Sequence, residues 1–323
     1  MSKKILLSGI QPSGRPHLGN YFGMMKQIVD SQDKYEIYCL IVDYHALNTV
    51  QNSTLMKEFT VGVLLDFLAI GLDPEKVTLV KQSDIYEHME LAWIFETITP
   101  MAYLMRSHAF KDAEAKNKTI SVGVFNYPLL MAADILLYDT DVVPVGSDQI
   151  QHIEIARDVA EKFNGTFGSI FKKPEAMIMN DVAIVPGIDG RKMSKSYSNT
   201  IPLFSEYEDI KKLVMSIVTD SGDDIPRNVF AIHKLIRSSL ELEKIYIEKK
   251  GKYKELKELL IVDLENFIAP LREKRKEFEK DIPKALAVLK EGSKKARNVA
   301  SKKMEEVRKK IGVDIYQNNP GKI

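Results

Sequence analysis

Residues 6–23 read LLSGIQPSGRPHLGNYFG, and this stretch decides the fold of the chain. The aliphatic run at residues 5–7 predicts a buried strand, and a loop of small and helix-breaking residues follows it. From His17 onward, apolar residues recur at helical spacing. A strand, a glycine-rich turn and a helix in this order are typical of nucleotide sites, because glycines allow close approach and helix-start amides attract phosphate. The same arrangement also serves as a plain connection, and neither G-x-G-x-x-G nor a Walker A loop is present.

A second stretch, GRKMSKS at residues 190–196, favours the nucleotide-binding interpretation. Two lysines three positions apart, Lys192 and Lys195, are interleaved with hydroxyl side chains in a glycine-led loop. Such a loop can place two ammonium groups on a polyphosphate while its serines donate hydrogen bonds. A charged run alone is usually a solvated surface. The specific signal is therefore the pair formed by this loop and PHLGN at residues 16–20.

These two motifs resemble the HIGH and KMSKS signatures of the class I aminoacyl-tRNA synthetases. KMSKS is matched letter for letter, whereas HIGH is matched at His17 and Gly19, with Leu18 and Asn20 at the other positions. Further stretches are similar to the tryptophanyl-tRNA synthetases, and the resemblance covers essentially the whole chain; the tyrosyl-tRNA synthetases are the main rival. These stretches are SGIQPSG (8–14), IVDYH (41–45), MAADILLY (131–138), VPVGSDQ (143–149) and VTDS (218–221).

Composition excludes several other classes of protein. The chain has 323 residues, 45% of them hydrophobic and 28% charged, as expected for a globular protein of about two domains. Its one cysteine, Cys39, allows neither a disulfide framework nor a cysteine-based zinc site. The N-terminal apolar run is too short for a signal peptide, and no apolar run reaches the roughly 18 residues of a membrane span. We therefore expect a cytoplasmic protein without a membrane partner.

The net charge of +1 is unevenly distributed. Residues 1–205 carry 19 basic and 24 acidic side chains, whereas residues 206–323 carry 27 basic and 21 acidic ones. A polyanion could dock on the C-terminal part. A lysine-rich, solvated helical surface explains the same excess equally well.

Alternating strand and helix patterns predict a doubly wound, parallel α/β sheet, followed by an all-α region. We expect a Rossmann-like catalytic domain at 1–205, with an inserted helical segment at about 84–122, and a helical domain at 206–323. Further strands are expected at 35–43, 76–81 and 141–145, with a hairpin at 176–185. The C-terminal helices are expected at 206–218, 227–248, 251–279, 281–290 and 292–311, with Gly292 as a break.

Asp134 lies within a strongly apolar helical pattern at residues 124–138. A carboxylate buried among such neighbours is costly unless a donor satisfies it. A structural partner inside the protein would meet this need, and so would the N–H group of a ligand. The residues alone leave both explanations open.

The resemblance implies a tryptophan–tRNA ligase that works in two steps. The carboxylate of tryptophan attacks the α-phosphate of Mg-ATP, giving tryptophanyl-adenylate and pyrophosphate. The acyl group then passes to the 3'-terminal ribose of tRNA(Trp). Because no protein nucleophile is needed, catalysis should consist of positioning and charge stabilisation. Mg²⁺ is expected to arrive on the phosphates, without a dedicated protein metal site.

The resemblance also implies a role for each matching position. The catalytic set, which holds the reacting phosphates, comprises His17, Asn20, Lys192 and Lys195. The ATP-binding set comprises Gln11, Pro12, Ser13, Gly19, Asn20, Gly146, Ser147, Asp148, Ile184, Lys192, Met193, Ser194, Lys195 and Ser196. The tryptophan-binding set, in which Asp134 accepts the indole N–H, comprises Leu7, Gly9, His45, Tyr127, Met131, Asp134, Val143, Val145 and Gln149.

The resemblance further implies tRNA(Trp) as the macromolecular partner, its anticodon read by residues 206–323, a homodimer, and no DNA partner. Two positions depart from the family pattern. Asn20 replaces the second histidine of HIGH. The family often carries Lys-x-Lys where this chain has only Lys111, which leaves open whether Lys111, Lys116 or Lys118 reaches a phosphate.

Two functions of other classes remain as alternatives. A nucleotidyltransferase of the His-x-Gly-His fold would also transfer an adenylyl group, but such enzymes lack the long helical tail and the full KMSKS loop. A catalytically inactive paralogue that only binds RNA is the second alternative. The intact His17, Asp134, Lys192 and Lys195 argue against it.

Overall fold

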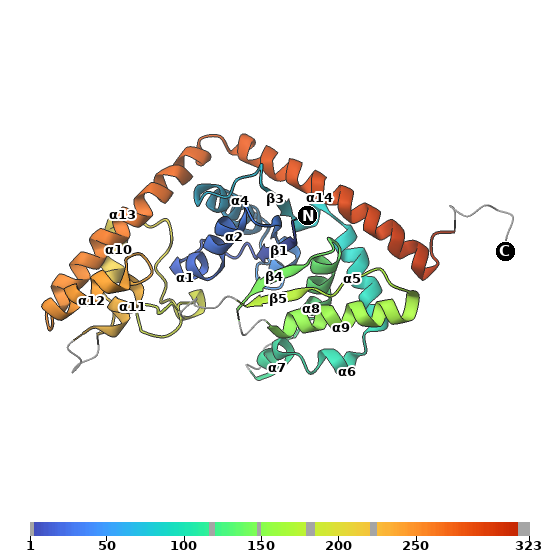
Figure 1. The fold of residues 1–323 in the computed structure, drawn as a ribbon, viewed down its shortest axis with the longest axis horizontal. Helices are drawn as coiled ribbons and strands as arrows, with labels where there is room; N and C mark the ends of the chain where they lie inside the picture. The colour runs from blue at the N-terminus through green and yellow to red at the C-terminus, as the bar shows by residue number, and fades with distance from the viewer. Residues whose placement is uncertain (1–2, 116–119, 147–149, 179–184, 220–224, 316–323) are drawn as a thin grey trace.

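A parallel β-sheet with the strand order β3-β2-β1-β4-β5 forms the centre of the molecule (Figure 1). The computed structural model describes residues 3–115, 120–146, 150–178, 185–219 and 225–315, apart from the side chains of residues 108, 109, 112 and 113. The strands are β1 (Ile5–Ile10), β2 (Glu36–Ile41), β3 (Val77–Lys81), β4 (Val142–Val145) and β5 (Glu175–Ile178). This sheet confirms the expected doubly wound α/β fold.

Strand side chains alternate between two hydrophobic cores on opposite faces of the sheet. In β1, Leu6 belongs to one core and Leu7 to the other. In β2, Cys39 belongs to the first core, and Tyr38 and Leu40 belong to the second. This period of two is that of a pleated strand buried on both faces, which explains why the strands read as continuous apolar runs.

Helices cover both faces of the sheet (Figure 1). The first core includes α1 (Leu18–Asn20), the π-helical turn η1 (Tyr21–Met25), α2 (Lys26–Ser31) and α4 (Ser53–Ala69). The second core includes α5 (Glu87–Ile98), α8 (Val122–Leu136) and α9 (Ile150–Phe167). Shorter helical pieces connect them: α3 (Asp43–Ala46), η2 (Gln82–Asp84), α6 (Met101–Leu104), α7 (His108–Ala115) and η4 (Lys195–Tyr197).

The chain after the KMSKS loop is helical, as expected. Its helices are α10 (Tyr207–Met215), α11 (Arg227–His233), α12 (Ser239–Glu248), α13 (Tyr253–Glu279) and α14 (Ile282–Ile311). Two expected boundaries are wrong. The stretch 227–248 forms two helices, and α14 continues without interruption through Gly292.

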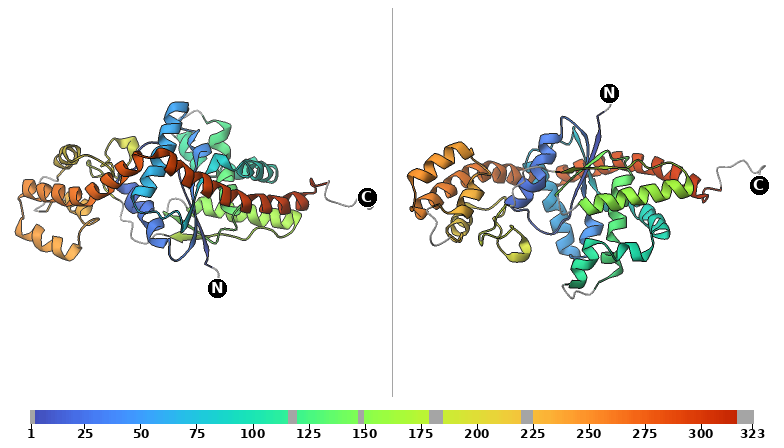
Figure 2. Two further views of the ribbon diagram at one scale, coloured as in Figure 1. Left: turned by 90° about the horizontal axis from the view of Figure 1, so that it is seen from above. Right: turned by 60° about the horizontal axis from the view of Figure 1, so that its bottom comes forward.

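Helix α14 turns back from the end of α13 and runs across the sheet part of the molecule (Figures 1 and 2). A Cβ atom on Gly292 would lie 2.0 Å from the carbonyl oxygen of Leu79 in β3. Next to it, Ser293 Oγ accepts a 3.1 Å hydrogen bond from the backbone N–H of Lys81. Gly292 is therefore the point of close contact between the helix and the edge strand, and this packing explains its presence inside a helix.

The helical region packs directly on the sheet part. Leu260 and Leu264 of α13 share the first core with the sheet, while Ala296 and Ala300 of α14 share the second. The division into domains at residue 205 stays a prediction. Within the described residues, no helix combines the length and the apolar character that crossing a membrane requires.

The hairpin expected at 176–185 lies mostly outside the described residues, and its first part forms strand β5. Strand β5 pairs in parallel with β4, with Ala176 opposite Val143. The chain reaches β5 from β4 through helix α9, as a βαβ crossover requires. Residues 179–184 lie outside the described residues.

Candidate active site

The HIGH-like motif forms the start of the N-terminal helix. His17 is the N-cap of α1: its Nδ1 accepts a 3.3 Å hydrogen bond from the Asn20 N–H, and Asn20 Oδ1 accepts a 3.1 Å hydrogen bond from the His17 N–H. Burial, reinforced by the positive charge of Lys195, lowers the pKa of His17 to about 4. The imidazole is therefore neutral near pH 7. Since Nδ1 accepts, its proton lies on Nε2.

The KMSKS loop lies directly against this helix start. A Cβ atom on Gly19 would be 3.0 Å from the His17 ring and 3.5 Å from Cβ of Met193. The chain beyond the loop is tied to the motif by backbone hydrogen bonds from Leu18 N to Ile201 O and from Leu203 N to Pro16 O, both 3.0 Å. Two motifs about 175 residues apart thus form one site, as the sequence predicts.

Lys195 reaches from the KMSKS loop to the loop after β1. Its Nζ donates to the carbonyl oxygens of Ser13 at 3.1 Å and Gly14 at 2.9 Å. Burial lowers the pKa of Lys195, although the charge of Asp66 acts in the opposite direction. A cavity of about 180 Å³ lies here, lined by Gln11, Ser13, Gly14, Asn20 and Lys195 among others. The ammonium group of Lys195, the amide side chains of Gln11 and Asn20 and the carboxylate of Asp66 thus lie around one small space.

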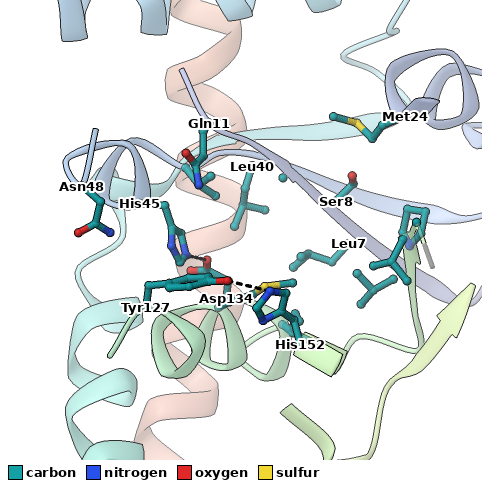
Figure 3. Close-up of a pocket in the computed structure, with 18 of the residues that line it drawn as sticks. Leu7, Ser8, Gln11, Met24, Leu40, His45, Asn48, Tyr127, Asp134 and His152 are labelled. Carbon is teal, nitrogen blue, oxygen red and sulfur yellow. Dashed lines mark hydrogen bonds and ion pairs between the residues drawn. The ribbon is translucent and has the colours of Figure 1, made fainter. Parts of the chain in front are cut away.

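A larger cavity of about 910 Å³ lies over the carboxyl ends of β1, β2 and β4 (Figure 3). It shares Gln11 with the smaller cavity. Eight of the nine expected tryptophan-binding residues line it: Leu7, Gly9, His45, Tyr127, Met131, Asp134, Val143 and Val145. Gly146 of the expected ATP set lines it as well. The wall is mostly apolar, with polar groups gathered around Asp134, as in sites for aromatic ligands.

Asp134 of α8 is buried at the wall of this cavity beside His45 (Figure 3), and three side chains contact its oxygens. His45 Nε2 lies 2.9 Å from Oδ2, and Gln82 Nε2 donates to both oxygens at 2.8 and 2.9 Å. His88 Nδ1 lies 2.7 Å from Oδ1. Burial acts to raise the pKa of Asp134, but the charges and hydrogen bonds of His88 and His45 outweigh it and lower this pKa to about 2. The carboxylate is ionised, and its two oxygens act only as acceptors.

Comparison with known proteins agrees with this geometry. A sequence model of the class I tRNA synthetases (W and Y) matches residues 2–276. The chain belongs to this family. A tryptophan–tRNA ligase of Fusobacterium nucleatum is 46% identical over 321 residues, which are 96% of this chain and 99% of the relative. The corresponding ligase of Rhodopirellula baltica is 45% identical over 317 residues, covering 95% and 99%.

A solved structure of a relative is similar over nearly the same length. The tryptophanyl-tRNA synthetase of Campylobacter jejuni, crystallised with ADP and tryptophan, superposes with a TM-score of 0.89. It is 43% identical in sequence, and the match covers 95% of this chain and 99% of that one. The resemblance to the tryptophanyl-tRNA synthetases drawn from the sequence motifs is confirmed.

Some residues that the sequence interpretation names in this class I synthetase lie outside the described part of the chain: Lys116, Lys118, Ser147, Asp148, Gln149 and Ile184. Of the remaining expected residues, Pro12 and Met193 are buried in the two motif loops, while Ser194 Oγ accepts from the Ser196 N–H at 3.3 Å. Lys111 is exposed on α7.

The sequence interpretation missed three residues of the synthetase site. Gln82 and His88 contact Asp134 from outside the cavity, and His152 Nε2 lies 2.7 Å from the Tyr127 hydroxyl. Gln82 carried a usable signal, because it directly follows β3 at the edge where doubly wound sheets bind ligands. The two histidines are single residues on helices, and nothing in their local sequence indicates the contacts they make.

Proposed function

We propose that the chain joins tryptophan to tRNA(Trp) using ATP. The observation that carries this proposal is the position of Asp134, which is buried and ionised at the wall of the large, mostly apolar cavity. This cavity shares Gln11 with the smaller cavity beside Lys195. The relatives from F. nucleatum and R. baltica are tryptophan–tRNA ligases, and the C. jejuni relative was crystallised with ADP and tryptophan. These relatives support the same substrates for this chain.

In the proposed complex, the indole ring lies among Leu7, Met131 and Val143, and its N–H donates to Asp134. A carboxylate offers about four acceptor positions. His45, Gln82 and His88 make four contacts with the two oxygens, so the indole N–H must share or replace one of them. Phenylalanine has no N–H to offer the carboxylate, and a site built for such a donor discriminates against it by roughly 10⁴-fold. Tyrosine can donate through its hydroxyl, so its rejection rests on the shape of the cavity.

The phosphates of ATP are proposed to lie between His17 and the two KMSKS lysines. Neutral His17 donates from Nε2, because its Nδ1 is used as the helix cap. Lys195 leaves its contacts with the Ser13 and Gly14 carbonyls to bind the β- and γ-phosphates, together with Lys192. Mg²⁺ enters on the phosphates, as part of the substrate.

The reaction proceeds by two displacements in this arrangement. A carboxylate oxygen of tryptophan attacks the α-phosphorus, and the bond to the bridging oxygen of pyrophosphate breaks. A ribose hydroxyl of tRNA then attacks the acyl carbon, and AMP leaves. The protein contributes position and positive charge, which is sufficient for phosphoryl transfer because no covalent enzyme intermediate is required.

The proposal extends to assembly and location. The basic excess of residues 206–323 supports anticodon binding by the helical domain. Exposed Met89 and Trp93 lie four residues apart on α5, and such an apolar pair supports a symmetric homodimer contact. The single cysteine, Cys39, is buried and has its pKa raised by burial, which suits a reduced thiol in the cytoplasm.

Amino-acid-dependent exchange of pyrophosphate into ATP tests the function. We expect exchange with tryptophan and at least about 10³-fold less exchange with phenylalanine, because phenylalanine has no N–H to donate to Asp134. Asp134→Asn keeps the shape of the side chain but removes its charge, and it should raise the KM for tryptophan far more than the KM for ATP. Exchange with tyrosine in place of tryptophan would move the assignment to the sister enzyme. No exchange with any of the three amino acids would contradict the proposal.

A further inference from the structure

His88 of α5 is a buried residue to which the proposed mechanism gives no task. It is 0% exposed and is not among the residues that line the large cavity. Its two ring nitrogens nevertheless have distinct partners: Nδ1 lies 2.7 Å from Asp134 Oδ1, and Nε2 lies 2.8 Å from the hydroxyl of Tyr138. A wholly buried imidazole with both nitrogens engaged has a fixed orientation.

The partners of His88 also fix which nitrogen carries the proton. Asp134 is ionised and can only accept, so a proton on His88 Nδ1 is favoured by this 2.7 Å ion-pair contact, although the two groups are not aligned as a hydrogen bond. The Tyr138 hydroxyl then donates to Nε2 of His88. Tyr138 is 1% exposed, and its ring stacks on that of Tyr38 in β2, with centroids 4.6 Å apart. A carboxylate oriented by a histidine whose other nitrogen is held by a third group is an arrangement that enzymes use to fix charge and tautomer.

The donors to Asp134 divide between its two oxygens. His88 contacts Oδ1. His45, which lines the cavity, contacts Oδ2 (Figure 3). Gln82 bridges both oxygens and, like His88, is not a lining residue. The contact of His88 therefore holds one oxygen of the carboxylate, while the other, Oδ2, lies beside His45 at the wall of the cavity.

We propose that His88, oriented by Tyr138, is the positioning residue that makes Asp134 selective for an indole N–H. This inference rests on the proposed function, because it assigns to Asp134 the contact with the substrate ring. Without the Nδ1–H donor, the buried carboxylate would lose a compensating partner and would turn or take up a proton. A protonated or turned Asp134 would no longer require an N–H group on the ligand.

Two substitutions at the same position separate the two nitrogens of His88. The amide nitrogen of asparagine lies near the place of Nδ1, so His88→Asn keeps a donor to Asp134. The amide nitrogen of glutamine lies near the place of Nε2, so His88→Gln keeps the contact with Tyr138 and loses the one with Asp134. Tyr138→Phe is a milder third variant, which removes only the hydroxyl that fixes the tautomer.

The readout is the ratio of kcat/KM for tryptophan to that for benzothienylalanine, measured by pyrophosphate exchange in the full-length protein. Benzothienylalanine has the shape of tryptophan but carries sulfur in place of the indole N–H. In His88→Gln we expect this ratio to fall by at least about tenfold, the cost of an unmade buried hydrogen bond. His88→Asn should keep most of the ratio, and Tyr138→Phe should lower it by a few-fold.

A purely structural role for His88 predicts a different outcome. Activity would then fall equally for both amino acids, the KM for ATP would rise with it, and the ratio would stay unchanged in every variant; that result overturns the inference. If both His88 variants fail to fold, the ratio in Tyr138→Phe decides in the same way. Failure of the proposed function is distinguishable, since the unmodified protein would then show no tryptophan-dependent exchange at all.

Discussion

At the scale of single residues, the site depends on side chains with two duties. His17 caps the first helix through Nδ1 and keeps Nε2–H for a ligand. Asn20 completes the same cap through its own side chain. In the second half of HIGH, an amide thus stands where the family pattern has a histidine, and it has a clear structural role. Substitutions must separate these two duties before they report on catalysis.

His17→Asn separates them, because asparagine is among the best N-cap residues but has no imidazole. We expect the thermal midpoint to stay near that of the unmodified protein, while kcat for pyrophosphate exchange falls by about 10²–10³, as for the loss of one transition-state donor. His17→Ala, which removes both functions, serves as the comparison and should lose stability as well. Unchanged kcat in His17→Asn would show that the residue is only a cap.

At the scale of elements, small residues on the inner face of helix α14 determine how closely it packs on the sheet. Its inner face carries Gly292, Ala296 and Ala300, which let the backbone approach the sheet closely. Farther along, Arg308 forms an ion pair with Glu90 of α5, and Lys303 pairs with Asp139 at 2.9 Å. Close packing at one end and ion pairs at the other hold the helix across the sheet edge.

Gly292→Ala tests this placement. The added Cβ would lie 2.0 Å from the Leu79 carbonyl oxygen, so α14 must move away from β3. We expect a loss of about 1–3 kcal/mol in the free energy of unfolding, as for overpacking, despite the better helix propensity of alanine. The control is Gly165→Ala in α9, where nothing lies within 4 Å and the change should leave stability equal or slightly higher. Thermal denaturation of both variants provides the measurement.

At the scale of the whole molecule, the sheet and the C-terminal helices are joined by a buried ion pair. Arg275 of α13 donates to Asp66 of α4, and Asp66 is 2% exposed. Asp66 also lines the small cavity beside Lys195. Burial, only partly offset by Arg275, raises the pKa of Asp66 to about 6. The ion pair therefore connects the C-terminal helices to a residue that lines the small cavity beside Lys195.

Arg275→Met removes the partner and leaves Asp66 as an uncompensated buried charge, which should cost about 3–5 kcal/mol at pH 8. Arg275 lowers the pKa of Asp66, so its removal raises this pKa further. The folded variant therefore gains more stability from taking up this proton than the unmodified protein does. The deficit should therefore shrink as the pH falls from about 8 to 5. The double variant Asp66→Leu/Arg275→Met should recover most of the stability in urea denaturation. A deficit independent of pH would contradict this account.

Much of the architecture was predictable, because strands and helices each produce a characteristic pattern of apolar residues within a short stretch of sequence. Apolar runs marked the buried strands, and helical periodicity marked the region after residue 206. The two phosphate motifs and the apolar positions of MAADILLY led to the residues that line the large cavity. The failure at Gly292 was also local in origin. Gly292 was interpreted as a helix break because its packing partner, the backbone of Leu79, is not visible in the local sequence.

The sequence by itself determined the fold class, the paired motifs and the family, because glycine loops, strand runs and helix periods act over a few residues. Only the tertiary structure decided what satisfies Asp134. Its donors His45 and Gln82 lie 89 and 52 residues away in the chain, and His88 comes from yet another helix. A carboxylate in an apolar helix predicts that donors must satisfy it, but only the folded chain shows which residues these donors are. The same holds for α14, whose place on β3 is set by a backbone contact across more than 200 residues.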